Sequence, residues 1–228
     1  MEKQKSIKRH RLLKYWVTSA QQQIGIVLAL LAAVLVFQFL FSSSVTVKEI
    51  LMNLPIFAVY MGVFVTFISV ITDMRNGTYV SVAFGGTRRE AFRGQQLSNI
   101  LRIIEIMLLY VIMAAIAFAI GDGAYTYSGA EFIICLGILL IVTGIVQLLA
   151  AISLRIGGKA LVILFALCGG AGGFMGGFFF SFASDHIGDG EMFLMRNQYG
   201  ALFLGIGVIA YVIGSFINYR FLRKYEVR

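Results

Sequence analysis

The sequence predicts an all-α polytopic membrane protein with six transmembrane helices and both termini in the cytoplasm. Of its 228 residues, 59% are hydrophobic and only 13% are charged, and the mean hydropathy is +0.87. A soluble domain is usually about 25% charged. One proline and 25 glycines, many of them within apolar runs, are also typical of transmembrane helices. We therefore expect a single transmembrane domain over residues 1–228.

Six apolar runs approach the roughly 20 residues that a helix needs to cross the hydrocarbon core. Backbone groups cannot stay unpaired in lipid, so each run is expected to be helical. The runs are uniformly apolar instead of alternating, which argues against a transmembrane β-barrel. The predicted spans are Ile24–Ser42, Leu54–Thr72, Ile100–Ile120, Phe132–Leu154, Ala160–Phe182 and Gly200–Phe221.

The distribution of lysine and arginine predicts the orientation. With both termini inside, only Lys48 and Arg196 of the 19 basic residues fall on the outer side. Because cytoplasmic loops carry the excess of basic residues, this orientation is strongly favoured over its inverse. The net charge of +8 then reflects membrane orientation, and we expect no nucleic-acid partner.

The N-terminal segment, residues 1–20, mixes basic and apolar side chains ahead of the first span. This pattern predicts an amphipathic helix in the headgroup plane. The alternative is a generic basic anchor. The following apolar run exceeds the ~7–15 residues of a signal-peptide core, which indicates an uncleaved span. The residues expected at the membrane interface are Lys8, Arg9, Arg11, Leu12, Leu13 and Trp16.

The stretch "FGGTRREAFRG" (84–94) lies within a predicted cytoplasmic excursion, Asp73–Asn99. Two glycines break the chain, and Thr87 precedes Glu90 by three positions, which is the capping-box pattern. The sequence thus predicts a short helix from Arg88 to about Gln96. Three arginines around Phe92 give it residue types that often dominate interfaces. Alternatively, the arginines bind lipid headgroups.

These features together resemble the permease subunit of a type-2 ATP-binding-cassette exporter. The likeness lies in the layout of nearly the whole chain and in a loose glycine-x-x-arginine theme. It implies that the helix of about residues 87–96 is a coupling helix that docks on a separate ATPase subunit. The implied docking residues are Thr87, Arg88, Arg89, Glu90, Phe92 and Arg93. It also implies that residues 1–20 form the family's connecting helix along the inner membrane surface.

The resemblance further implies partners and location. A second permease subunit, identical or paralogous, would complete the pathway, and ATP and Mg²⁺ would bind the ATPase, so this chain would be neither an enzyme nor a cofactor carrier. The cargo would be hydrophobic or amphipathic (a peptide, lipid or drug). The protein would lie in the cytoplasmic membrane of a prokaryote. A six-span carrier or membrane scaffold without an ATPase is the alternative.

The run "CGGAGGFMGGFFF" (168–180) has small residues at four-residue spacing, which lets helices approach closely. Ordinary helix packing through these glycines is expected, and a break in the fifth span is the alternative. The packing residues expected are Gly169, Gly172, Gly173, Gly176 and Gly177.

Polar residues inside the predicted spans are few. Arg102 and Glu105 lie three apart near the inner end of the third span, and their spacing predicts an anchoring pair on one helix face. No predicted span carries a central Asp, Glu, Lys or His, which argues against a proton- or sodium-coupled carrier. "SLRIGGKA" lacks the leading glycine and the Ser/Thr of a P-loop. His10 and His186 fall on opposite sides of the membrane, so no metal site is expected.

Overall fold

The computed structural model describes residues 2–41, 53–85, 87–120, 129–156 and 197–224, which are almost entirely helical. Five helices are long and apolar enough to cross a membrane, as expected of a multi-pass membrane protein. The predicted fifth span, Ala160–Phe182, lies outside the described residues. In chain order the elements are α1 (Glu2–Phe41), α3 (Leu54–Thr72), the π-helix η1 (Asp73–Gly77), α4 (Thr78–Ala83), α5 (Arg88–Ile120), α6 (Gly129–Ile156) and α8 (Asn197–Lys224).

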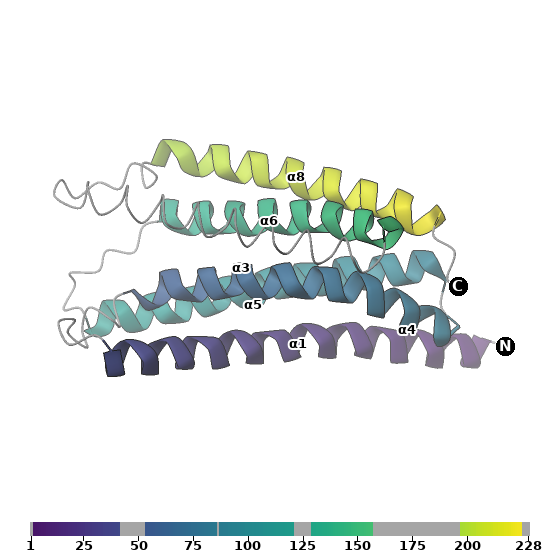
Figure 1. The fold of residues 1–228 in the computed structure, drawn as a ribbon, viewed down its shortest axis with the longest axis horizontal. Coiled ribbons are helices and arrows are strands. Elements are labelled where there is room, and N and C mark those ends of the chain that lie inside the picture. The colour runs from purple at the N-terminus through teal and green to yellow at the C-terminus, as the bar shows by residue number, and fades with distance from the viewer. Residues whose placement is uncertain (1, 42–52, 86, 121–128, 157–196, 225–228) are drawn as a thin grey trace.

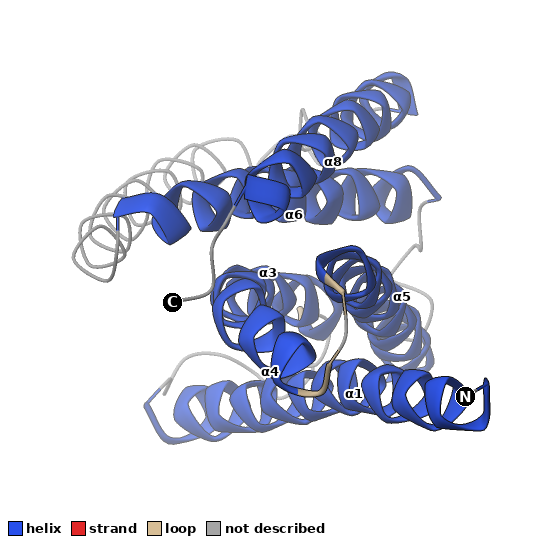
Figure 2. Ribbon diagram, turned by 90° about the vertical axis from the view of Figure 1, so that its right-hand side faces the viewer, coloured by secondary structure: helices blue, strands red, loops and turns tan. Residues whose placement is uncertain are grey.

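The helices run roughly side by side in layers (Figure 1). Helix α1 covers one face, α3 and α5 lie in the middle, and α6 packs with α8 on the other side (Figure 2). The start of α1, the turn between α4 and α5, and the end of α8 all lie at one end of the molecule (Figure 1). The basic segments that predict the inner side of the membrane are therefore gathered at a single end.

Helix α1 is one continuous helix of 40 residues, so the prediction of a separate interfacial helix over residues 1–20 is wrong. No proline or glycine interrupts residues 2–24, and a buried stripe at three- and four-residue spacing runs through the expected break. This stripe packs against the middle layer, which keeps the segment in line with the span. Its members are Leu12, Trp16, Ala20, Gln23, Val27 and Leu31.

Helices α3, η1 and α4 follow one another without a break, because the junction residues Asp73 and Thr78 keep helical dihedrals. Residues 54–83 thus form one continuous helical segment, roughly 45 Å long along its path, in which α4 turns from the direction of α3 towards α1 (Figures 1 and 2). Helix α5 returns beside it for 33 residues. The predicted short helix of about residues 87–96 begins as expected but does not end there, since it continues into the third span. The expected cytoplasmic excursion is therefore a helical hairpin.

Glycines bring α6 and α8 into backbone contact. A Cβ on Gly214 would lie 2.3 Å from the carbonyl oxygen of Gly144, and one on Gly207 would lie 2.7 Å from that of Gly137. Small residues at such positions allow close helix packing in membranes. The glycines predicted for this role, residues 169–177, lie outside the described residues. The close contact found here is made by other glycines.

Candidate functional site

The turn between α4 and α5, which we call the hairpin tip (residues 84–85 and 87–93), is closed by local hydrogen bonds. Gly85 has φ 74°, a left-handed conformation that glycine adopts without strain, and its N–H donates to the carbonyl of Val82 at 2.8 Å. Beyond it, the predicted capping box is confirmed. The N–H of Thr87 donates to Glu90 Oε2 at 2.9 Å, and the N–H of Glu90 donates to Thr87 Oγ1 at 3.2 Å. The tip is thus held by its own backbone and caps.

The tip exposes a cationic surface. Thr87, Arg88, Arg89 and Arg93 are all exposed. Arg88 donates from Nη1 to the carbonyl oxygen of Arg223, at the end of α8, at 2.9 Å. Arginine forms planar, multiply hydrogen-bonded contacts with carboxylates, so this surface suits an acidic partner.

Phe92 does not serve as an exposed anchor at the tip. Its ring lies 5.1 Å from that of Tyr219 in a tilted arrangement, and it packs against a buried cluster around Met74 and Leu222. The exposed aromatic ring at the tip is that of Phe84, which is 48% exposed. Sequence reasoning missed Phe84 because it falls before the glycine break, outside the predicted helix.

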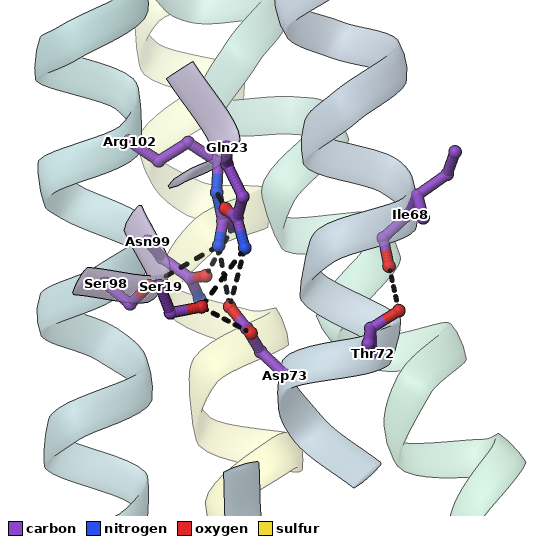
Figure 3. Close-up of polar contacts among 8 residues, drawn as sticks. All are labelled: Ser19, Gln23, Ile68, Thr72, Asp73, Ser98, Asn99 and Arg102. Atoms are coloured by element: carbon purple, nitrogen blue, oxygen red, sulfur yellow. Dashed lines mark hydrogen bonds and ion pairs between the residues drawn. The ribbon is translucent and has the colours of Figure 1, made fainter. Parts of the chain in front are cut away.

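Behind the tip lies a buried ion pair that joins η1 to α5. Arg102 Nη2 and Asp73 Oδ2 are 2.7 Å apart, and their side chains are 2% and 6% exposed (Figure 3). The predicted pairing of Arg102 with Glu105 is therefore wrong. Asp73 comes from the segment expected to be a solvated excursion. Only helical continuation through η1 brings it back to face Arg102.

Further polar groups complete this cluster (Figure 3). Arg102 donates from Nε to Gln23 Oε1 and from Nη1 to Asn99 Oδ1 at 3.1 Å. Ser19 Oγ donates to the other carboxylate oxygen of Asp73 at 3.1 Å. Because α1, η1 and α5 all contribute, the cluster ties three elements together at the root of the hairpin. A buried arginine requires such partners, since an unpaired buried charge is costly.

Trp16 is wedged beside the same cluster. It is 1% exposed, and a Cβ on Gly94 or Gly77 would lie 2.1 Å or 2.3 Å from its indole ring. The glycines therefore form the notch that receives the ring. Trp16 and Leu12 were expected at the membrane interface. Both are buried within the protein, where they contact other helices instead of lipid. Arg11 and Leu13 are exposed, and the side chains of Lys8 and Arg9 lie outside the described part of the chain.

A second polar cluster, without formal charge, links α5 to the α6–α8 layer. Gln96 Nε2 donates to Gln147 Oε1 at 3.0 Å, and the hydroxyl of Tyr211 donates to Gln96 Oε1 at 2.8 Å. Asn218 Nδ2 donates to Gln95 Oε1 at 3.2 Å. In a membrane such bonds hold helices together because lipid offers polar groups no alternative partner. The hairpin is thus bonded to both layers that flank it.

Comparison with known proteins finds no similar family model, no similar curated protein and no similar solved structure. Within the described ranges, no group of three or more His, Cys, Asp or Glu could hold a metal ion. What these residues offer chemically is therefore an exposed cationic surface and buried polar links, with no cluster suited to metal-based chemistry in the described part.

Proposed function

We propose that this chain is the permease subunit of an ATP-binding-cassette exporter and that a separate ATPase docks on the hairpin tip. The observation that carries the proposal is the continuity of α5. A capped, arginine-rich tip and an apolar span belong to one 33-residue helix. A force on the tip would pass into the membrane without crossing a flexible joint.

The length of the hairpin supports this role. The apolar helix α3 ends at Thr72, and the helical segment continues to Ala83, roughly 16 Å further along its path at 1.5 Å per residue. With the positive-inside orientation, the tip would lie on the cytoplasmic side of the prokaryotic cytoplasmic membrane, beyond the end of the apolar helix α3. The arginines would then meet carboxylates of the ATPase.

The translocation pathway would be formed with a second permease subunit, identical or paralogous. Exposed side chains along α8 are mostly large and apolar, including Leu202, Ile209 and Phe216. Such a surface suits lipid contact, a second subunit and a hydrophobic or amphipathic cargo. ATP and Mg²⁺ would act on the ATPase, and this chain would transmit the motion.

Co-purification from the native membrane tests the proposal. The tagged wild type should retain an ATPase, whereas Arg89→Glu/Arg93→Glu should lose it, because two reversed charges repel an acidic cleft. Within the described ranges neither arginine makes a hydrogen bond or ion pair, so the variant should still insert. The matched control is Arg220→Glu/Arg223→Glu, which reverses two exposed charges on α8 at the same end of the molecule.

The remaining outcomes are also informative. If the wild type retains no ATPase, the exporter assignment fails and the carrier or scaffold alternative replaces it. If the tip variant keeps the ATPase, the docking surface is elsewhere. If both charge-reversed variants lose it equally, binding depends on general charge and the tip is not the docking element.

A further inference from the structure

We infer that a pocket between α1 and the hairpin tip binds the headgroup of one anionic phospholipid. This inference does not rest on the proposed ATPase partner. The pocket has a volume of about 430 Å³, within the range of small-ligand sites. It is lined by Arg11, Lys14, Tyr15, Thr18, Ser19, Gln22 and Phe84.

The lining chemistry matches a phosphate. Two cations, three hydroxyl groups and one amide line the pocket, and no acidic side chain does. The Ser19 hydroxyl donates to Asp73, so the hydroxyls of Tyr15 and Thr18 are the ones that can donate to a phosphate. The ion pair resolved among the described residues is that of Asp73 and Arg102, so Arg11 and Lys14 have no carboxylate partner there. A phosphate diester accepts hydrogen bonds from cations and hydroxyl groups of this kind.

The floor of the pocket is electrostatically prepared for an anion. The hydroxyl of Ser19, which lines the pocket, donates a hydrogen bond to Asp73 Oδ1 behind it. That carboxylate would repel a phosphate if it were unpaired. Its ion pair with Arg102, at 2.7 Å, offsets part of this repulsion. The positive charge of Arg11 and Lys14 therefore dominates the open side.

The position of the pocket selects a lipid over a soluble phosphate. Along α1 the basic residues come first, then Thr18 and Gln22, then exposed Ile26 one turn further into the span. This order matches that of a phospholipid: phosphate, glycerol esters, acyl chains. Gln23 contacts Asp73, the first residue after the apolar helix α3, so the inner end of the pocket lies at the level where the span ends. Tyr15 supplies the amphipathic aromatic ring typical of a membrane interface.

Lipid retention in native mass spectrometry tests the inference. The wild type would be reconstituted in nanodiscs of phosphatidylcholine with phosphatidylglycerol, then released into detergent, and the bound lipid measured. We expect one phosphatidylglycerol to remain bound. In Arg11→Gln/Lys14→Gln, retention should fall about 30-fold. Each basic residue near an anionic lipid strengthens binding by roughly fivefold, and two such residues are removed. Both side chains are exposed, so folding should be preserved.

The control variant is Arg220→Gln/Arg223→Gln, which removes the same charge from the opposite layer and should retain lipid as the wild type does. Equal loss in both variants would show diffuse attraction and overturn the inference. Unchanged retention in the pocket variant would also overturn it. A third arm adds inorganic phosphate or glycerol phosphate without lipid. If these bind the pocket as tightly as phosphatidylglycerol, the ligand is a soluble phosphate and the lipid assignment is wrong.

Discussion

At the scale of single residues, the arrangement around Arg102 shows how a charge is kept inside an apolar bundle. Its guanidinium bonds Asp73, Gln23 and Asn99, which come from three different elements. Burying two charges is costly, and the mutual attraction compensates only when the remaining donors are also satisfied. The cluster therefore selects one register of α1 against the hairpin, because a shift of either would leave a buried charge unpaired.

Removing one charge of this pair should destabilise the protein strongly. We expect Asp73→Asn to lower the free energy of unfolding by about 3–5 kcal/mol, because Arg102 would be left buried without a counter-charge. The double variant Asp73→Asn/Arg102→Gln should lose less, since neither charge remains. Thermal unfolding in detergent can be followed by the fluorescence of Trp16, the single tryptophan, which is 1% exposed.

Glu105→Gln is the matched control for that experiment, because Glu105 lies on the same helix and acts on Arg102 only by longer-range attraction, without the ion pair that Asp73 forms. Its midpoint should stay close to that of the wild type. A double variant as unstable as Asp73→Asn alone would contradict the role assigned to charge pairing.

At the scale of elements, contact between helices depends on where side chains are missing. Gly94 and Gly77 admit the ring of Trp16, and the glycines of α6 and α8 admit a neighbouring backbone. The two cases differ in how a substitution would be absorbed. An indole ring can shift within its notch, whereas a helix backbone can move only by separating from its neighbour.

The α6–α8 contact gives a direct test with an internal control. Gly214→Ala would place a Cβ 2.3 Å from a backbone oxygen of α6, so we expect a loss of about 1–3 kcal/mol. Gly205→Ala, on the same helix, meets nothing within 4 Å and should be neutral or slightly stabilising, since alanine is the better helix former. The midpoint of thermal unfolding measures both. Equal effects of the two substitutions would show that the close contact is not important for stability.

At the scale of the whole molecule, the polarity of the ends determines how the bundle sits in a membrane. The basic start of α1, the hairpin tip and the basic end of α8 share one end (Figure 1). The first turn of α6 lies at the opposite end (Figure 1). The positive-inside rule predicts that this end faces the cytoplasm, which the proposed docking of an ATPase requires.

Cysteine labelling tests this orientation. After Cys135 and Cys168 are replaced by serine, Arg89→Cys and Arg223→Cys should react with a membrane-impermeant maleimide only in permeabilised cells. Gly129→Cys, an exposed residue at the other end, should react in intact cells. The reverse pattern would place the tip outside and would exclude the proposed docking.

Several features follow from the sequence alone because their causes are local. Composition determines the membrane class, since five of the predicted spans correspond to helices long and apolar enough to cross a bilayer. The capping box between Thr87 and Glu90 needs only a three-residue spacing, and it is present as predicted. Orientation was likewise predicted from charge along the chain and remains a prediction.

Other features depend on which helix faces meet, and only the tertiary structure determined them. Arg102 forms its ion pair with Asp73, 29 positions away, instead of with the nearby Glu105. Phe92 packs inward against Tyr219, and Phe84 is the exposed aromatic residue at the tip. Helix α1 stayed continuous because its buried stripe crosses the expected break. In each case the position of the side chain depends on the free energy of burial and pairing between distant segments. The spacing of residues within one segment gives no information on those contacts.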